Sequence, residues 1–226
     1  MKKLIYVPII HMGADLGSIA KSVDEKGIAG FGEGFWKKHK ETISGFWDSI
    51  SKYFANLEVQ DFKIYQDGMV TDGEVGQKIV EEGIKAGSKN YEIVADLLKR
   101  GAILAQTEDF KLVKEERDRL VAMTQAKSIP QKLIAFVKYK FVKDILLNKR
   151  DKFIANRINE TLNNGATGII FIGAYHNIKE RLPKDIQITE IKDVNKVRGY
   201  QRLLPFYNKN RKRFEELSRY LVSEIN

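Results

Sequence analysis

Five short apolar runs recur along the chain, and longer stretches with helical spacing separate them. The runs are LIYVPII (4–10), FKIY (62–65), AILA (102–105), GIIFIG (168–173) and IQITEI (186–191). GIIFIG is apolar throughout and does not alternate, which is typical of a strand covered on both faces. The pattern predicts an α/β fold: a mainly parallel central sheet of about five or more strands, with helices on both faces and helical insertions.

The stretch 35–57 carries an aromatic stripe at helical spacing, including Phe46, Trp47 and Phe54. We interpret the stripe as core packing, with a lid or a homodimer face as the alternatives. The glycine-rich GIAGFGEG (27–34) precedes it. This segment lacks the Lys-Ser/Thr of a P-loop and the spacing of a dinucleotide fingerprint, so it predicts a flexible loop.

Helical spacing predicts several further helices. They are expected over 74–99 (two pieces, broken near Gly87-Ser88), 108–126, 131–148, 151–163 and about 207–224. The helix 131–148 opens at Pro130 and has an apolar face. That face is formed by Leu133, Phe136, Val137, Phe141 and Ile145. No internal repeat or linker interrupts the chain, which predicts one α/β domain over 1–226, with helical insertions at about 35–57 and 108–148.

Composition narrows the classes of protein. The 226 residues are 43% hydrophobic, enough for one packed core. The chain has no cysteine, which excludes disulfides, thiolate zinc sites and a cysteine nucleophile. No apolar segment approaches the roughly 20 residues that a transmembrane helix needs. We therefore expect no membrane span and a cytoplasmic location.

The net charge of +9 leaves more than one interpretation open. Basic residues concentrate at Lys138–Lys152 and Lys196–Arg213. Exposed, solvated helix faces account for such stretches in many soluble proteins. Nucleic-acid binding is the alternative, but no recognised motif accompanies the charge, and FVKYKFVK fits an amphipathic helix equally well.

Polar residues follow four of the predicted strands. His11 follows the first, Asp67 the second, Glu108 the third and His176 the fourth. Ligands of open parallel sheets bind beyond the carboxyl ends of the strands, so these positions predict a working site. Imidazole serves both metal ligation and acid–base chemistry near neutral pH. The third histidine, His39 in WKKHK, is expected to be exposed.

The carboxylates and arginines each have a structural interpretation as well. Asp67 precedes Gly68 and fits a turn, and Glu108 fits the first turn of a helix. In RDKFIANRINETL, Arg157 falls beside the apolar face, with Arg150 two turns earlier. A buried guanidinium needs an anionic partner, which is either a structural ion pair or a substrate or oxyanion clamp.

These residues resemble the TraB/TIKI group, part of a wider set that includes ChaN-like and erythromycin-esterase-like proteins. The resemblance lies in a strand ending in His11, the helix RDKFIANRI and the run GIIFIGAYH. The group typically carries two G-x-x-H motifs. Gly173-Ala174-Tyr175-His176 matches the second, while Pro8-Ile9-Ile10-His11 has proline where glycine is usual. Asp67 falls where glutamate is more common. The resemblance implies metal-dependent proteolysis, ester hydrolysis, haem or iron binding, or control of peptide signals.

The leading hypothesis is a metal-dependent hydrolase, peptidase- or esterase-like, that acts on a peptide or an ester. Two histidines and a carboxylate suit zinc, manganese or iron. The metal ligands would be His11, His176 and Glu108. The catalytic residues would be the same three together with Arg157. The substrate-binding residues would be Arg150, Tyr175 and Asp67.

Three alternatives stay open. The same residues can act without metal, as a His/Glu acid–base pair whose arginines hold an anion. The chain can be a non-catalytic protein that binds a peptide, haem or another small molecule, with the aromatic residues near 35–54 as an apolar wall. A basic nucleic-acid-binding protein is the third.

Overall fold

A computed structural model of the chain describes residues 1–11, 13, 15, 20–125 and 129–225. A five-stranded, all-parallel sheet runs through its centre in the order β3-β2-β4-β1-β5. The strands are β1 (Lys2–Ile9), β2 (Lys63–Gln66), β3 (Ile103–Ala105), β4 (Thr167–Gly173) and β5 (Ile186–Glu190). The predicted parallel α/β fold is confirmed.

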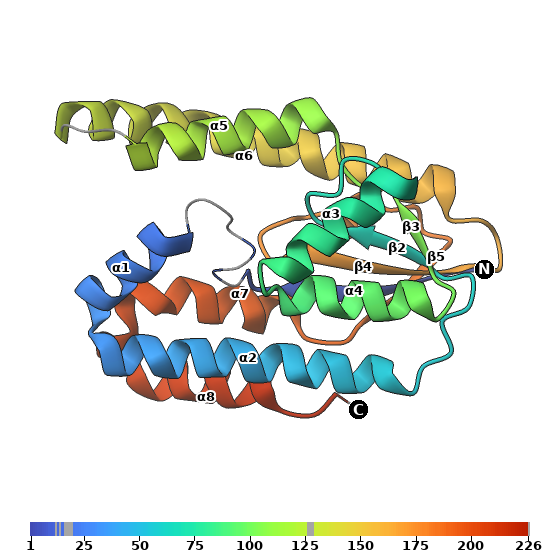
Figure 1. The fold of residues 1–226 in the computed structure, drawn as a ribbon, viewed down its shortest axis with the longest axis horizontal. Helices are drawn as coiled ribbons and strands as arrows, with labels where there is room; N and C mark the ends of the chain where they lie inside the picture. The colour runs from blue at the N-terminus through green and yellow to red at the C-terminus, as the bar shows by residue number, and fades with distance from the viewer. Residues whose placement is uncertain (12, 14, 16–19, 126–128, 226) are drawn as a thin grey trace.

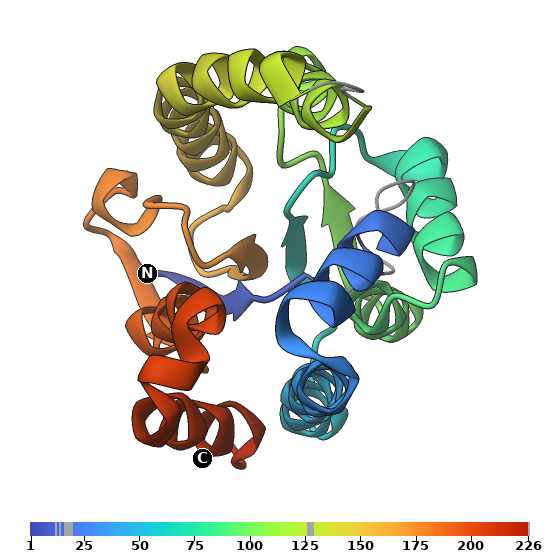
Figure 2. The same cartoon turned by 90° about the vertical axis from the view of Figure 1, so that its left-hand side faces the viewer.

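Helices cover both faces of the sheet (Figures 1 and 2). The core on one face contains side chains of α2 (Glu33–Ala55), α3 (Gly73–Lys85), α4 (Lys89–Lys99), α7 (Val194–Leu203) and α8 (Arg211–Val222). The core on the other face contains Ile154, Ile158 and Leu162 from the end of α6 (Ile129–Thr161) and its continuation. No helix in the described part of the chain is long and apolar enough to cross a membrane.

The aromatic stripe of α2 is core packing, as interpreted from its spacing. Trp36, Phe46, Trp47 and Phe54 are all buried, and the Phe54 ring packs 5.8 Å from that of Phe171 on β4. A helix with this many aromatic side chains on one face is stabilised by burying them against the apolar strands.

The glycine-rich stretch 27–34 is mostly helical, so the prediction of a flexible loop is wrong. Helix α1 (Ala20–Phe31) runs into it, and only Gly32, with φ of 84°, separates α1 from α2. A Cβ on Gly27 would lie 2.4 Å from the ring of Trp36. This glycine therefore allows two helices to approach closely, a role that composition alone does not distinguish from flexibility.

The two helices expected over 131–148 and 151–163 are one continuous helix, α6. No glycine or proline lies between residues 148 and 151 to break it. Helix α5 (Phe110–Gln125) packs alongside α6, and the two extend past the carboxyl ends of the strands (Figure 1). The expected break near Gly87 does occur, between α3 and α4.

The end of the chain holds more structure than the single helix expected at about 207–224. Helix α7 precedes a 3-10 segment, Leu204–Lys209, and α8 follows it. The Asp193 carboxylate accepts hydrogen bonds from the backbone N–H groups of Asn195 and Lys196 and so caps α7. In the sequence, Asp193 is the residue that indicates the start of this helix, because the helix itself has few apolar residues.

Replacing the buried Phe46 tests the core on the α2 face. Phe46→Ala is expected to lower the free energy of unfolding by about 3–5 kcal/mol, because it removes a fully buried ring and leaves a cavity. Urea titration followed by circular dichroism measures the change. Phe110→Ala, at an exposed ring, is the matched control and should cost less than about 0.5 kcal/mol. Equal losses in the two variants would contradict this packing.

Candidate functional site

Four neighbouring strands bring their carboxyl ends to one edge of the sheet. Along that edge β3 leads to Glu108, β2 to Asp67, β4 to His176 and β1 to His11. The parallel registers pair Ile9 with Gly173 and Gln66 with Phe171, so the residues that follow these pairs are level with one another. The structure thus gathers the four side chains that follow the strands.

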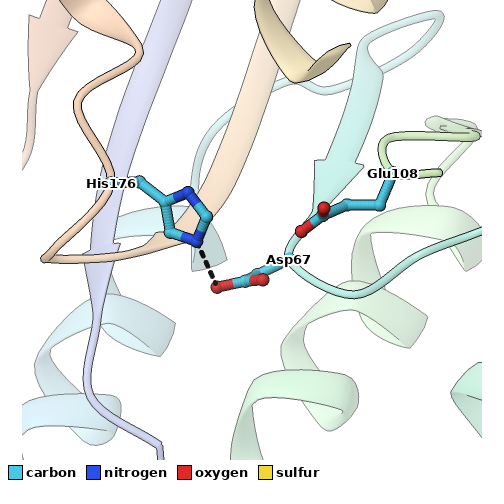
Figure 3. Close-up of side chains that lie close together, drawn as sticks. All are labelled: Asp67, Glu108 and His176. Atoms are coloured by element: carbon cyan, nitrogen blue, oxygen red, sulfur yellow. Dashed lines mark ion pairs between the residues drawn. The ribbon is translucent and has the colours of Figure 1, made fainter. Parts of the chain in front are cut away.

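The Asp67 carboxylate lies at the centre of this group. Its Oδ2 accepts a hydrogen bond from the backbone N–H of Gly173 at 3.0 Å. The Nε2 atoms of His11 and His176 each lie 3.7 Å from the same Oδ2. Figure 3 shows the imidazole of His176 pointing at Asp67, with the Glu108 carboxylate nearby. One ligand atom from each of Asp67, Glu108 and His176 lies within 4.8 Å of the others.

Gly173, the first residue of the G-x-x-H motif, leaves room for this convergence. A Cβ added there would lie 3.1 Å from Asp67 Oδ2, 3.5 Å from His176 Cδ2 and 3.8 Å from His11 Nε2. A side chain at this position would therefore crowd the Asp67 carboxylate, while it would be in ordinary contact with the two imidazoles.

Asp151 of α6 fixes the orientation of His176. The Asp151 Oδ1 lies 2.6 Å from His176 Nδ1, and its Oδ2 accepts the backbone N–H of Asn177 at 2.9 Å. An ionised carboxylate only accepts, so Nδ1 carries the proton, which leaves the Nε2 of a neutral ring with its lone pair directed at Asp67. The sequence analysis does not identify Asp151 as a site residue. The one feature of the sequence that marks it is the position of a charged side chain beside the apolar face of a helix.

Arg150, also on α6, is surrounded by carboxylates. Its Nε donates to Glu108 Oε2 and its Nη2 to Asp67 Oδ1, each at 2.8 Å. Its Nη2 also donates to Glu108 Oε1, and its Nη1 to Glu116 of α5. The guanidinium is buried. Arg150 therefore forms an ion cluster that ties α5 and α6 to the strand ends, and sequence reasoning also missed Glu116.

Burial and the neighbouring charged side chains shift the pKa values of these groups in opposite directions. Burial opposes ionisation of Asp67, but His176, His11 and Arg150 outweigh it and hold the pKa of Asp67 well below its usual range. For Glu108 burial dominates over the Arg150 contact, and its pKa is raised. Burial disfavours the imidazolium of His176, but Asp67 and Asp151 outweigh it and raise the pKa of His176.

His11 is the open side of the group. Its side chain is 41% exposed, whereas those of Asp67 and His176 are buried. A hollow of about 80 Å³ lies beside it, and the apolar part of its lining includes Val23, Trp36 and Ile43. The His11 side therefore offers a small molecule an approach to the carboxylates and imidazoles.

Two of the residues predicted for the site lie outside the cluster. Within the described structure, Arg157 contacts Glu160 at 3.2 Å and the carbonyl of Gln106 at 3.5 Å, and it does not reach Asp67. Tyr175 is exposed in the loop before His176, with the Arg202 guanidinium 6.0 Å from its ring centre.

His39 is not exposed, contrary to the expectation from its lysine-rich surroundings. It is half-buried, and its Nδ1 lies 2.7 Å from the hydroxyl of Tyr200 on α7. Burial lowers the pKa of His39 to about 4. It therefore stays neutral at physiological pH and belongs to the packing of α2 against α7.

Comparison of the chain with known protein families, with curated proteins and with solved structures gave no match.

His39 and His176 should titrate at separate pH values in metal-free protein. His39 is expected to titrate near pH 4, and His176 above its unfolded value of about 6.5. The stability contributed by neutral His39 is then present above pH ~6.5 and lost as the pH falls towards 4. That contributed by His176 is present below pH ~6.5 and lost as the pH rises through its folded pKa. Imidazole NMR measures both; a shared midpoint near 6.5 would contradict the burial described.

Proposed function

We propose that the chain is a divalent-metal-dependent hydrolase whose ion is held by His11, His176 and Asp67. The observation that carries this is the distance of 3.7 Å from each imidazole Nε2 to the one Asp67 oxygen. The distance is longer than a hydrogen bond. For each His–Asp67 pair it is close to the roughly 3.4 Å between two ligands of one tetrahedral ion with bonds of about 2.1 Å. The ligand atoms of His176, Asp67 and Glu108 also lie within 4.8 Å of one another, while His11 joins the group through Asp67.

The donor set fits a metal in two further respects. The arrangement of Asp151 behind His176 is the common support for a metal-bound imidazole, because it fixes the tautomer and raises ligand basicity. In addition, Asp67, Glu108 and Glu116 bring three carboxylates around one guanidinium, that of Arg150. Buried negative charge in excess of its partners favours a bound cation. Imidazole with carboxylate suits zinc, manganese or iron.

A bound divalent ion would lower the pKa of a water molecule and polarise the carbonyl to be cleaved. The chain's own residues would then handle the proton. Among the carboxyl groups of the cluster, Glu108 has a raised pKa, which makes it the better acceptor near neutral pH. Its Oε2 takes a hydrogen bond from Arg150 alone among the described groups, so one lone pair remains for the proton.

Arg150 would act by holding Asp67 and Glu108 in place and not by clamping the substrate, since carboxylates take up its donors. The substrate would approach His11, with a small apolar group in the hollow beside Trp36. A peptide or ester with such a group next to the scissile carbonyl is the substrate class that this arrangement favours. Arg157 has no part in this mechanism, because it contacts Glu160 instead.

Metal content tests the proposed ligands. The wild-type protein is expected to retain close to one zinc, manganese or iron ion per chain after gel filtration, and His11→Ala, His176→Ala and Asp67→Asn are expected to lose it. Elemental analysis of folded protein makes the measurement. His39→Gln, at the histidine outside the cluster, is the matched control and should retain the ion. Undiminished metal in the three ligand variants would rule out the site.

Gly173→Ala keeps every proposed ligand and changes only the space between them. Because the added Cβ would lie 3.1 Å from Asp67 Oδ2, the carboxylate must shift, and we expect metal affinity to fall by about tenfold or more. Competition with a fluorescent chelator measures the affinity. Gly199→Ala on α7, where the nearest atom to the Cβ is at 3.5 Å, is the control and should bind as the wild type does. Equal affinities would show that Gly173 is not needed for the site.

Hydrolysis itself is tested with a panel of p-nitrophenyl esters and peptide anilides. Activity towards at least one of them should disappear on exhaustive chelation and return with zinc, manganese or ferrous ion. The activity should also fall at least a hundredfold in Glu108→Gln while the metal content is kept. Turnover that survives chelation would favour a metal-free acid–base pair, and metal binding without any turnover would favour a binding protein.

A further inference from the structure

Nearly all of the net charge of the chain lies in the α5–α6 hairpin. Residues 110–161, which span both helices, contain 13 Lys and Arg against 6 Asp and Glu, a net +7 of the total +9. The remainder of the chain is close to neutral. The hairpin extends past the carboxyl ends of the strands, away from the sheet (Figure 1). The basic character is thus a property of one projecting element.

The same hairpin presents a row of apolar side chains to solvent. Val137, Phe141 and Ile145 on α6 are 41%, 77% and 54% exposed. They follow one another at intervals of four residues and so share one face of the helix. The opposite face carries the buried Leu146 and Arg150. We call Val137, Phe141 and Ile145 the α6 stripe. The sequence marks this face as apolar, and within the described structure nothing covers it.

Lysines continue and flank the α6 stripe. Lys149 follows Ile145 by one turn, and Lys152 follows Phe141 by three turns on the same face. Both lysines are exposed, and neither forms an ion pair within the described residues. Asp144, beside Phe141, is the one exposed acid at the stripe and contacts Lys143 at 4.0 Å. On α5, by contrast, Lys114 and Arg119 are paired with Asp118 and Glu115.

We propose that the α6 stripe docks on an anionic lipid surface, with α6 lying in the plane of the headgroups. A helix face with an exposed aromatic ring and aliphatic side chains flanked by lysines matches both parts of such a surface. The apolar groups enter the headgroup boundary, and the ammonium groups meet lipid phosphates. This inference rests on residues outside the metal cluster and is independent of the hydrolase proposal.

The other occupants of this face fit less well. A second copy of the chain would bring a hairpin of charge +7 against another of the same charge, which costs free energy. A nucleic acid would use the lysines but would leave Phe141 and Ile145 without a function. The face is also the convex outer surface of a helix, which suits a flat lipid surface better than a peptide in a groove.

Vesicle sedimentation of the full chain tests the proposal. The wild type is expected to sediment with vesicles of phosphatidylcholine and phosphatidylglycerol and to stay in solution with phosphatidylcholine alone. Phe141→Ser combined with Ile145→Ser should lower the partition coefficient about tenfold or more. Lys149→Gln and Lys152→Gln should each lower it about fivefold at low salt. Asp144→Asn should raise it, because it removes the one exposed carboxylate at the stripe.

The control is Phe206→Ser, at a ring that is 58% exposed outside the hairpin, and it should bind vesicles as the wild type does. Three results would each overturn the proposal. They are a wild type that stays in solution with anionic vesicles at low salt, stripe variants that bind undiminished, and stripe variants that change only the mass of the particle in light scattering. The last result would instead assign the stripe to contact between copies of the chain. Metal content, measured on the same samples, reports on the hydrolase site separately.

Discussion

The guanidinium of Arg150 is the contact on which the arrangement of the site depends. Asp67 and Glu108 follow adjacent strands, and Glu116 comes from α5; all three carboxylates converge on this one cation. Without it, buried carboxylates at this separation would repel each other and take up protons. With it, Asp67 stays ionised, and its second oxygen, which also accepts the backbone N–H of Gly173, faces the two imidazoles. The cluster thus joins the sheet, α5 and α6 into one unit.

Helix α6 connects this cluster to two other parts of the molecule. Arg150 and the next residue, Asp151, serve different partners: the first holds the carboxylates and the second orients His176. Earlier on the same helix lies the α6 stripe, exposed to solvent. The stripe and the buried Arg150 lie on opposite faces of this one helix.

The sequence predicts the sheet well because the strands are short runs rich in apolar residues between stretches of helical spacing, a pattern that depends only on local residues. It also identifies His11, Asp67, Glu108 and His176, because their places after the strands follow from the general behaviour of parallel sheets. The sequence does not show which other side chains these four residues contact. Asp151 and Glu116 come from helices whose rotation the sequence does not specify, and so they were missed. Arg157 has the spacing of a site residue but turns towards Glu160. His39 looks like a surface residue among lysines, yet packs against Tyr200 from a distant helix.

The central claim is that His11 and His176 face one oxygen of Asp67 in order to share an ion with it. The most direct measurement is a crystal structure of the zinc- or manganese-loaded protein with anomalous data collected at the edge of the metal. The account predicts an anomalous peak about 2.1 Å from Asp67 Oδ2 and from both Nε2 atoms. A structure with no peak at this position, or with the metal bound at His39 or on the surface, would contradict it.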